Sequence, residues 1–128
     1  MTHPDSRTAS VRRIAAIDVG SNSIRQIIAD VRPDGTIDVV DEMKAHPRLG
    51  RGMERTRALS TESMDLAVDA LQRMATLAKQ QGAQRIEAVA TSAVRDAENR
   101  RDFLDLVREE TGLKVRLLTG EEIGRAHV

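Results

Sequence analysis

The sequence predicts an α/β fold built on a mixed five-stranded sheet, with the element order β-β-β-α-β-α-β. Two observations support this prediction. Three apolar strands follow one another near the N-terminus, separated only by short turns rich in glycine, serine, asparagine and proline. The rest of the chain then alternates between amphipathic helices and short apolar strands. Because crossover connections between parallel strands are right-handed, we expect the last two strands to run parallel to the first.

The first three strands are predicted to form an antiparallel meander, at residues 12–19, 23–31 and 36–43. The second turn contains Pro33, Asp34 and Gly35, in which proline suits an early turn position and glycine allows a positive φ. Residues 44–59 contain two glycines and a proline among several arginines, so they are predicted to form a loop.

A long helix is predicted after Ser60, which is a suitable N-cap, and it should end near Gly82. Apolar residues recur there at steps of three and four, which predicts one buried face: Met64, Ala67, Val68, Leu71, Met74, Ala75 and Ala78.

The second helix is predicted over residues 100–110, with Asn99 as its cap and Gly112 as its end. Its inner face should carry Phe103, Leu104 and Val107. The remaining two strands are predicted at residues 85–90 and 115–118.

Composition narrows the class of protein. A chain of 128 residues fits one domain, and its 20 basic and 20 acidic residues cancel, so neither nucleic acid nor an anionic membrane is indicated as a partner. The absence of cysteine excludes disulfides and thiolate metal sites, and no apolar run is long enough to span a membrane. We therefore expect a cytoplasmic protein, with residues 1–11 disordered and one domain over residues 12–122.

The candidate site is the turn after the first strand, where an apolar run ends in Asp18 and is followed by Gly20, Ser21, Asn22 and Ser23. Glycine lets the backbone approach a ligand, and successive N–H groups can form an anion site with hydroxyls beside it. Asp18 is placed to hold a hydrated metal ion or a water. A turn of small polar residues is more commonly only a turn, and that alternative stays open on composition alone.

The parallel strands should bring three segments to one edge of the sheet: residues 18–23, 91–95 and 120–122. On this edge Arg95 can bind an oxyanion through its planar guanidinium, although an ion pair with Asp96 or Glu98 is the alternative. For Arg48 and Arg51 a solvated loop is the favoured interpretation.

Four segments resemble the exopolyphosphatase/guanosine pentaphosphate phosphohydrolase (Ppx/GppA) family of actin-like proteins. AAIDVGSNSIRQIIADV at residues 15–31 resembles its first phosphate loop, and RLGRGM at 48–53 its RLG-x-G segment. VATSAVRDAENRRDFL at 89–104 resembles the AT-x-A-x-R-x-A-x-N signature, and LLTGEE at 117–122 the start of SG-x-EEAR.

The resemblance implies one ribonuclease H-like half of an actin-like ATPase fold, of the kind shared by sugar kinases, chaperone ATPases and actin. It implies a Mg²⁺-dependent phosphohydrolase that removes the terminal phosphate of inorganic polyphosphate or guanosine pentaphosphate, and a homodimer for the full-length protein. By the same resemblance, Gly20, Ser21, Asn22, Ser23 and Arg95 bind phosphate and Asp18 orients Mg²⁺ or water.

The chain departs from the family at its end. Aligned without gaps, the position of the catalytic base falls on Ile123, which cannot accept a proton, so Glu121 or Glu122 would have to substitute. Residues 123–128, IGRAHV, match the translation of a common sequencing-adapter read. We therefore expect a non-native tail on a truncated gene product, and little activity from the chain as it stands.

Two other functions remain open at this point. One is a non-catalytic phosphate- or nucleotide-binding module. The other is an actin-like sugar kinase or ATPase, which is disfavoured because kinases of that group more often carry DxGTT- or DxGTS-like turns than DVGSNS.

Overall fold

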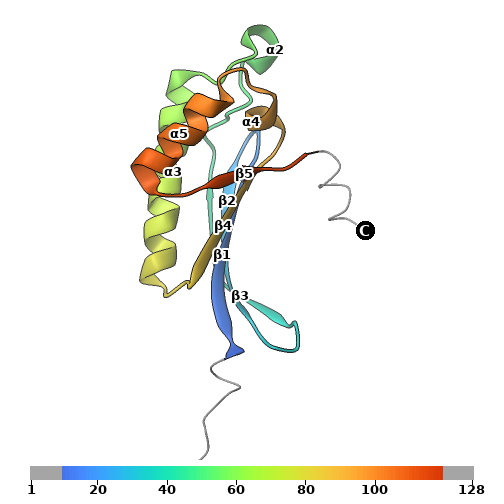
Figure 1. Ribbon diagram of the computed structural model, residues 1–128, viewed down its shortest axis with the longest axis vertical. Helices are drawn as coiled ribbons and strands as arrows, with labels where there is room; N and C mark the ends of the chain where they lie inside the picture. The colour runs from blue at the N-terminus through green and yellow to red at the C-terminus, as the bar shows by residue number, and fades with distance from the viewer. Residues whose placement is uncertain (1–9, 120–128) are drawn as a thin grey trace, which may run out of the picture.

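The computed structural model describes residues 10–119, and it shows one five-stranded sheet in the spatial order β3-β2-β1-β4-β5 (Figure 1). The elements are β1 (Arg12–Val19), β2 (Ile24–Val31), β3 (Ile37–Ala45), α2 (Met53–Thr56), α3 (Thr61–Gln80), β4 (Arg85–Ala90), α4 (Ser92–Asp96), α5 (Arg100–Thr111) and β5 (Val115–Leu117). The first strand pairs antiparallel with β2 and parallel with β4, and β5 is parallel to β4. The predicted mixed sheet is confirmed, and so is the parallel orientation of its last two strands relative to the first.

Two short helices were missed in the sequence. The helix α2 lies inside the segment predicted as a loop. The helix α4 lies directly after β4, where only a connecting segment was expected. Each is about one turn long, too short for apolar periodicity to be visible. Neither N-cap residue, Gly52 or Thr91, makes a side-chain capping bond, so the usual start signal is also absent.

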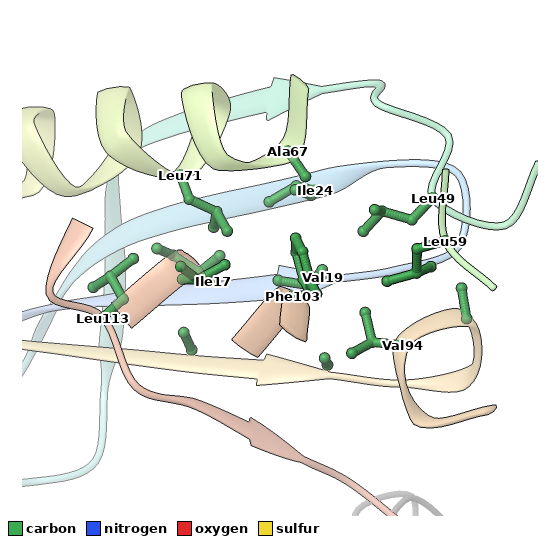
Figure 2. Close-up of a cluster of buried hydrophobic side chains, with 14 of the residues drawn as sticks. Ile17, Val19, Ile24, Leu49, Leu59, Ala67, Leu71, Val94, Phe103 and Leu113 are labelled. Atoms are coloured by element: carbon green, nitrogen blue, oxygen red, sulfur yellow. The ribbon is translucent and has the colours of Figure 1, made fainter. Parts of the chain in front are cut away.

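The two long helices, α3 and α5, cover one face of the sheet (Figure 1). The pleat of β1 buries Ile17 and Val19 toward these helices and leaves Asp18 exposed on the opposite face. Figure 2 shows the resulting core, in which Phe103 of α5 and Leu71 of α3 meet Ile17. Among residues 10–119, no helix is both long enough and apolar enough to cross a membrane.

The ends of the helices show how local sequence sets their bounds. Ser60 caps α3 as predicted, because its hydroxyl accepts a hydrogen bond from the Ser63 N–H at 3.1 Å. Gly112 ends α5 with a φ of 77°. Asn99 occupies the N-cap position of α5 but makes no capping bond, because its side chain is engaged with the backbone of Leu59 instead.

The carboxyl ends of β1, β4 and β5 lie at one edge of the sheet, the end where α2 and α4 also lie (Figure 1). The N–H of Thr91 donates to the Val19 carbonyl at 3.3 Å, and the N–H of Leu118 donates to the Ala90 carbonyl at 2.9 Å. The sheet therefore delivers the segments that follow β1 and β4 to a common edge. Residues 120–122, the third segment predicted there, lie outside the described residues.

Candidate functional site

The turn between β1 and β2 presents unused backbone donors. The N–H of Gly20 closes the turn by donating to the Ser23 carbonyl at 2.9 Å, so it is not available to a ligand. The N–H groups of Ser21, Asn22 and Ser23 donate to no other group of residues 10–119. Successive N–H groups in a turn are able to bind an anion together where they point to the same side.

A close contact explains the glycine of this turn. A Cβ at Gly20 would lie 3.1 Å from the Ser23 carbonyl oxygen, the acceptor that closes the turn. A larger residue would therefore press the two ends of the turn apart. The turn keeps its shape because Gly20 lacks that atom.

Ser92, the first residue of α4, joins the site from the neighbouring strand. The Oγ atoms of Ser21 and Ser92 lie 3.2 Å apart, within hydrogen-bonding distance. Ser92 was not singled out in the sequence, although it lies within the predicted segment 91–95. Its position two residues after the buried end of β4 was the available signal.

Residues 48–52 are hydrogen-bonded to the same turn. The N–H of Gly50 donates to the Ser21 carbonyl at 2.8 Å, and the N–H of Arg48 donates to the Asn22 carbonyl at 3.2 Å. A Cβ at Gly50 would lie only 3.1 Å from the Ser21 Cβ, so glycine permits this close approach. Arg48 and Arg51 are exposed, as a solvated loop predicts, but they are held beside the turn.

An open hollow of about 540 Å³ lies between these segments. We call it the turn hollow; its lining includes Ser21, Asn22, Arg48, Arg51, Ser92 and Asp96. Its volume is within the range of small-ligand sites, roughly 300–1,000 Å³. The lining combines two serine hydroxyls and two arginines with two carboxylates, those of Glu54 and Asp96.

Arg95 lies in α4 but does not line the turn hollow. Its Nε donates to Asp96 Oδ1 at 3.1 Å, and its side chain is 33% exposed. The ion pair with Asp96, which the sequence offered as the alternative to oxyanion binding, is therefore observed. The two Nη atoms make no hydrogen bond within residues 10–119, so they are still available to an anion.

Asp18 stands apart from the turn hollow, exposed on the face of the sheet that the helices leave open and opposite Arg25 of β2. Within residues 10–119, no three His, Cys, Asp or Glu side chains cluster to hold a metal ion. A lone carboxylate fits Mg²⁺ held mainly by waters and phosphate oxygens, and it does not fit a cage of protein ligands. Glu121, Glu122 and Ile123 lie outside the described residues.

The fold is that of the ribonuclease H-like half of an actin-like ATPase. A crystal structure of the Aquifex aeolicus Ppx/GppA family member superposes with a TM-score of 0.85 at 34% identity, covering 90% of this chain and 37% of that chain. An exopolyphosphatase structure from Cytophaga hutchinsonii gives a TM-score of 0.80 at 27% identity, covering 86% of this chain and 35% of its own.

The Ppx/GppA phosphatase family model matches residues 27–127, and the chain belongs to this family. Exopolyphosphatase 1 of Mycobacterium tuberculosis is 34% identical over 113 residues, which is 88% of this chain and 33% of the relative. Guanosine-5'-triphosphate,3'-diphosphate pyrophosphatase of Vibrio atlanticus is 32% identical over 117 residues, which is 91% of this chain and 23% of the relative. The chain thus spans a third or less of the length of these curated relatives.

Proposed function

We propose that this chain forms one wall of the active site of a phosphohydrolase that removes the terminal phosphate from inorganic polyphosphate or guanosine pentaphosphate. The observation that carries the proposal is the row of unused N–H donors at Ser21, Asn22 and Ser23. The names of the relatives support the substrate class, since one is an exopolyphosphatase and another a guanosine pentaphosphate pyrophosphatase.

In this proposal the turn binds the terminal phosphoryl group. Phosphoryl transfer spreads negative charge over the equatorial oxygens, so its catalysis needs positioned donors and cations. The three N–H groups supply fixed donors, and the hydroxyls of Ser21 and Ser92 are close enough to share one oxygen between them. Arg95 adds a cation if its Nη atoms turn toward the anion while Nε stays on Asp96.

Mg²⁺ is the proposed cofactor, with Asp18 as its one carboxylate among the described residues. When bound, the ion would neutralise charge on the phosphate oxygens and order the attacking water. Asp18 lies in β1, the strand that leads into the turn, two residues before Gly20. Its exposure leaves room for a hydrated ion between the carboxylate and a substrate phosphate.

We propose that Glu121 or Glu122 acts as the general base, although both lie outside the described residues. We further propose a homodimer in the cytoplasm for the full-length protein, without nucleic-acid partners. The balance of 20 basic and 20 acidic residues supports the last point, because it creates no overall attraction to a polyanionic duplex.

Two matched samples test the function. The 128-residue chain is titrated with inorganic polyphosphate by calorimetry, and the protein expressed from its genomic locus is assayed for phosphate release from polyphosphate and guanosine pentaphosphate with Mg²⁺. We expect binding by both samples and efficient release only where a glutamate base and the rest of the cleft are present. Ser21→Pro, which removes a donor N–H, should weaken binding in both.

Three outcomes decide between the candidates. Binding of polyphosphate without release of phosphate by the genomic protein, unchanged when the glutamate restored at position 123 is replaced by Gln, would favour a non-catalytic module. Phosphate transfer from ATP to a sugar would establish a kinase. No affinity for any phosphate compound would overturn the proposal altogether.

A further inference from the structure

A second open hollow adjoins the turn hollow. It has a volume of about 870 Å³, and its lining includes His46, Arg48, Arg51, Arg55, Ser60 and Glu62. We call it the basic hollow. Arg48, Arg51 and Gly52 line both hollows, so the two form neighbouring parts of one surface and share these residues as a common wall.

The charges of the basic hollow are unbalanced. Three arginines and a histidine face a single carboxylate, that of Glu62. Seven arginines elsewhere in residues 10–119 are paired with carboxylates, at Arg13, Arg25, Arg32, Arg73, Arg85, Arg95 and Arg108. Arg48, Arg51 and Arg55 have no such partner among the described residues, and the same holds for Arg12, Arg57, Arg100 and Arg101; only the first three are gathered around one hollow. Gathered guanidinium groups without counter-charges suit a polyanion, because each forms planar bidentate contacts with phosphate.

The backbone of Arg48 is held in an unfavourable conformation. Its φ of 52° is in the left-handed region, where a bulky residue is strained by about 1–2 kcal/mol. Three hydrogen bonds maintain it: its N–H donates to Asn22, and its carbonyl accepts from Ser63 Oγ at 3.3 Å and from the Arg51 N–H at 3.0 Å. Glycine or asparagine would adopt this conformation more easily. Arg57 shares it, with a φ of 58°, but lines neither hollow, whereas the three hydrogen bonds of Arg48 hold its side chain at the wall that the two hollows share.

We propose that the basic hollow is a second anion subsite, which takes the inner phosphates of a linear inorganic polyphosphate while the terminal phosphate lies at the Ser21–Ser23 donors. Arg48 and Arg51, at the common wall, bridge the two. The subsite rests on the function proposed above. Its occupant is a repeating phosphate chain because three guanidinium groups and one carboxylate line the basic hollow, whereas no Phe, Tyr or Trp does.

The test compares Arg55→Ala with Arg101→Ala in the 128-residue chain. Arg55 lines only the basic hollow, whereas Arg101 is an equally charged, exposed residue of α5 that lines neither hollow. Calorimetric affinities are measured for orthophosphate and for long-chain polyphosphate. Arg55→Ala should weaken long-chain binding by roughly fivefold and orthophosphate binding by less, because only the long chain occupies both subsites at once. Arg101→Ala should change neither.

Arg48→Gly provides a second variant, in which a loss of affinity can be separated from a loss of folding. It removes the guanidinium and also relieves the backbone strain, so thermal unfolding should show a stability equal to or above that of the parent while long-chain affinity falls. Arg48→Lys, which keeps the charge without the planar fork, should recover only part of the affinity.

The failures of the two proposals are distinguishable. If Ser21→Pro abolishes phosphate binding but Arg55→Ala and Arg101→Ala have the same effect on long chains, the basic subsite is wrong and the turn site stands. If orthophosphate binding is unaffected by Ser21→Pro, the turn site is wrong. A preference for guanosine pentaphosphate that depends on Arg55 would overturn the assignment of the subsite to inorganic chains.

Discussion

The side chain of Asn99 holds both polar backbone groups of Leu59. Its Oδ1 accepts a hydrogen bond from the Leu59 N–H at 2.8 Å, and its Nδ2 donates to the Leu59 carbonyl at 3.0 Å. Leu59 is 3% exposed and lies 40 residues before Asn99. These two hydrogen bonds connect the end of residues 48–59 to the start of α5. They therefore help to hold the lining of the basic hollow, which includes Leu59, in place.

Asn99→Ala should lower the free energy of unfolding by about 1–3 kcal/mol, because it leaves two buried backbone groups of Leu59 without partners. Urea denaturation measures this effect. Asn99→Asp keeps the acceptor and loses the donor, so it should lie between the parent and Asn99→Ala. Equal stability of all three proteins would contradict a structural role for this pair.

Gly50→Ala should weaken polyphosphate binding. The new Cβ would meet the Ser21 Cβ at 3.1 Å, which pushes residues 48–52 away from the turn and spreads the donors and arginines apart. Such overpacking also costs roughly 1–3 kcal/mol of stability.

The double variant Gly50→Ala/Ser21→Gly is the control for this prediction. It removes the Cβ that the new methyl group meets, so part of the lost stability should return. A double variant as destabilised as the sum of its single changes would show that the two positions do not interact.

Gln26→Met should leave stability unchanged or raise it. Gln26 is 1% exposed, its Nε2 donates to the Met74 carbonyl at 3.0 Å, and its buried Oε1 has no partner in the described structure. Methionine fills a similar volume without an unpaired oxygen. Thermal unfolding measures the change, and a marked fall in the melting temperature would show that the bond to Met74 outweighs the unpaired oxygen.

Asp30→Asn should make stability less sensitive to acid. Arg13 donates to both carboxylate oxygens of Asp30, at 2.8 and 3.0 Å, and this hydrogen bonding lowers the pKa of Asp30 below its ordinary value. A lowered pKa in the folded state stabilises the protein above the unfolded pKa, near pH 4, and this contribution is lost as the pH falls through the folded pKa. Denaturation curves from pH 6 downward, over roughly four pH units, should therefore fall less steeply for Asp30→Asn; identical slopes would contradict the assignment.

Strong local patterns explain which parts of the fold were predictable. The strands β1 and β4 have the predicted bounds, and Ser60 and Gly112 mark helix ends as expected. The predicted second and third strands each begin one residue early, and the third ends two residues early, because β3 continues through exposed Lys44 to half-buried Ala45. Asn99 was predicted as a cap, but its partner Leu59 is distant in sequence and no local signal identifies it.

The candidate site was predictable only in its local part. The turn at residues 20–23 follows from a glycine and hydroxyls after a buried strand, and the structure places it at the common edge of the sheet. The hydrogen bonds from Arg48 and Gly50 to that turn join two loops. Contacts between loops leave no periodic signal, so the position of these arginines beside the turn could not be inferred from their sequence.

The central claim is that the unused N–H groups of the β1–β2 turn bind phosphate. Amide chemical shifts of the isotopically labelled 128-residue chain, followed by NMR during titration with inorganic polyphosphate, test it most directly. The account predicts saturable shifts that are largest at Ser21, Asn22 and Ser23 and that extend to residues 48–55. Shifts confined to other surfaces, or none at these three amides at saturating polyphosphate, would contradict it.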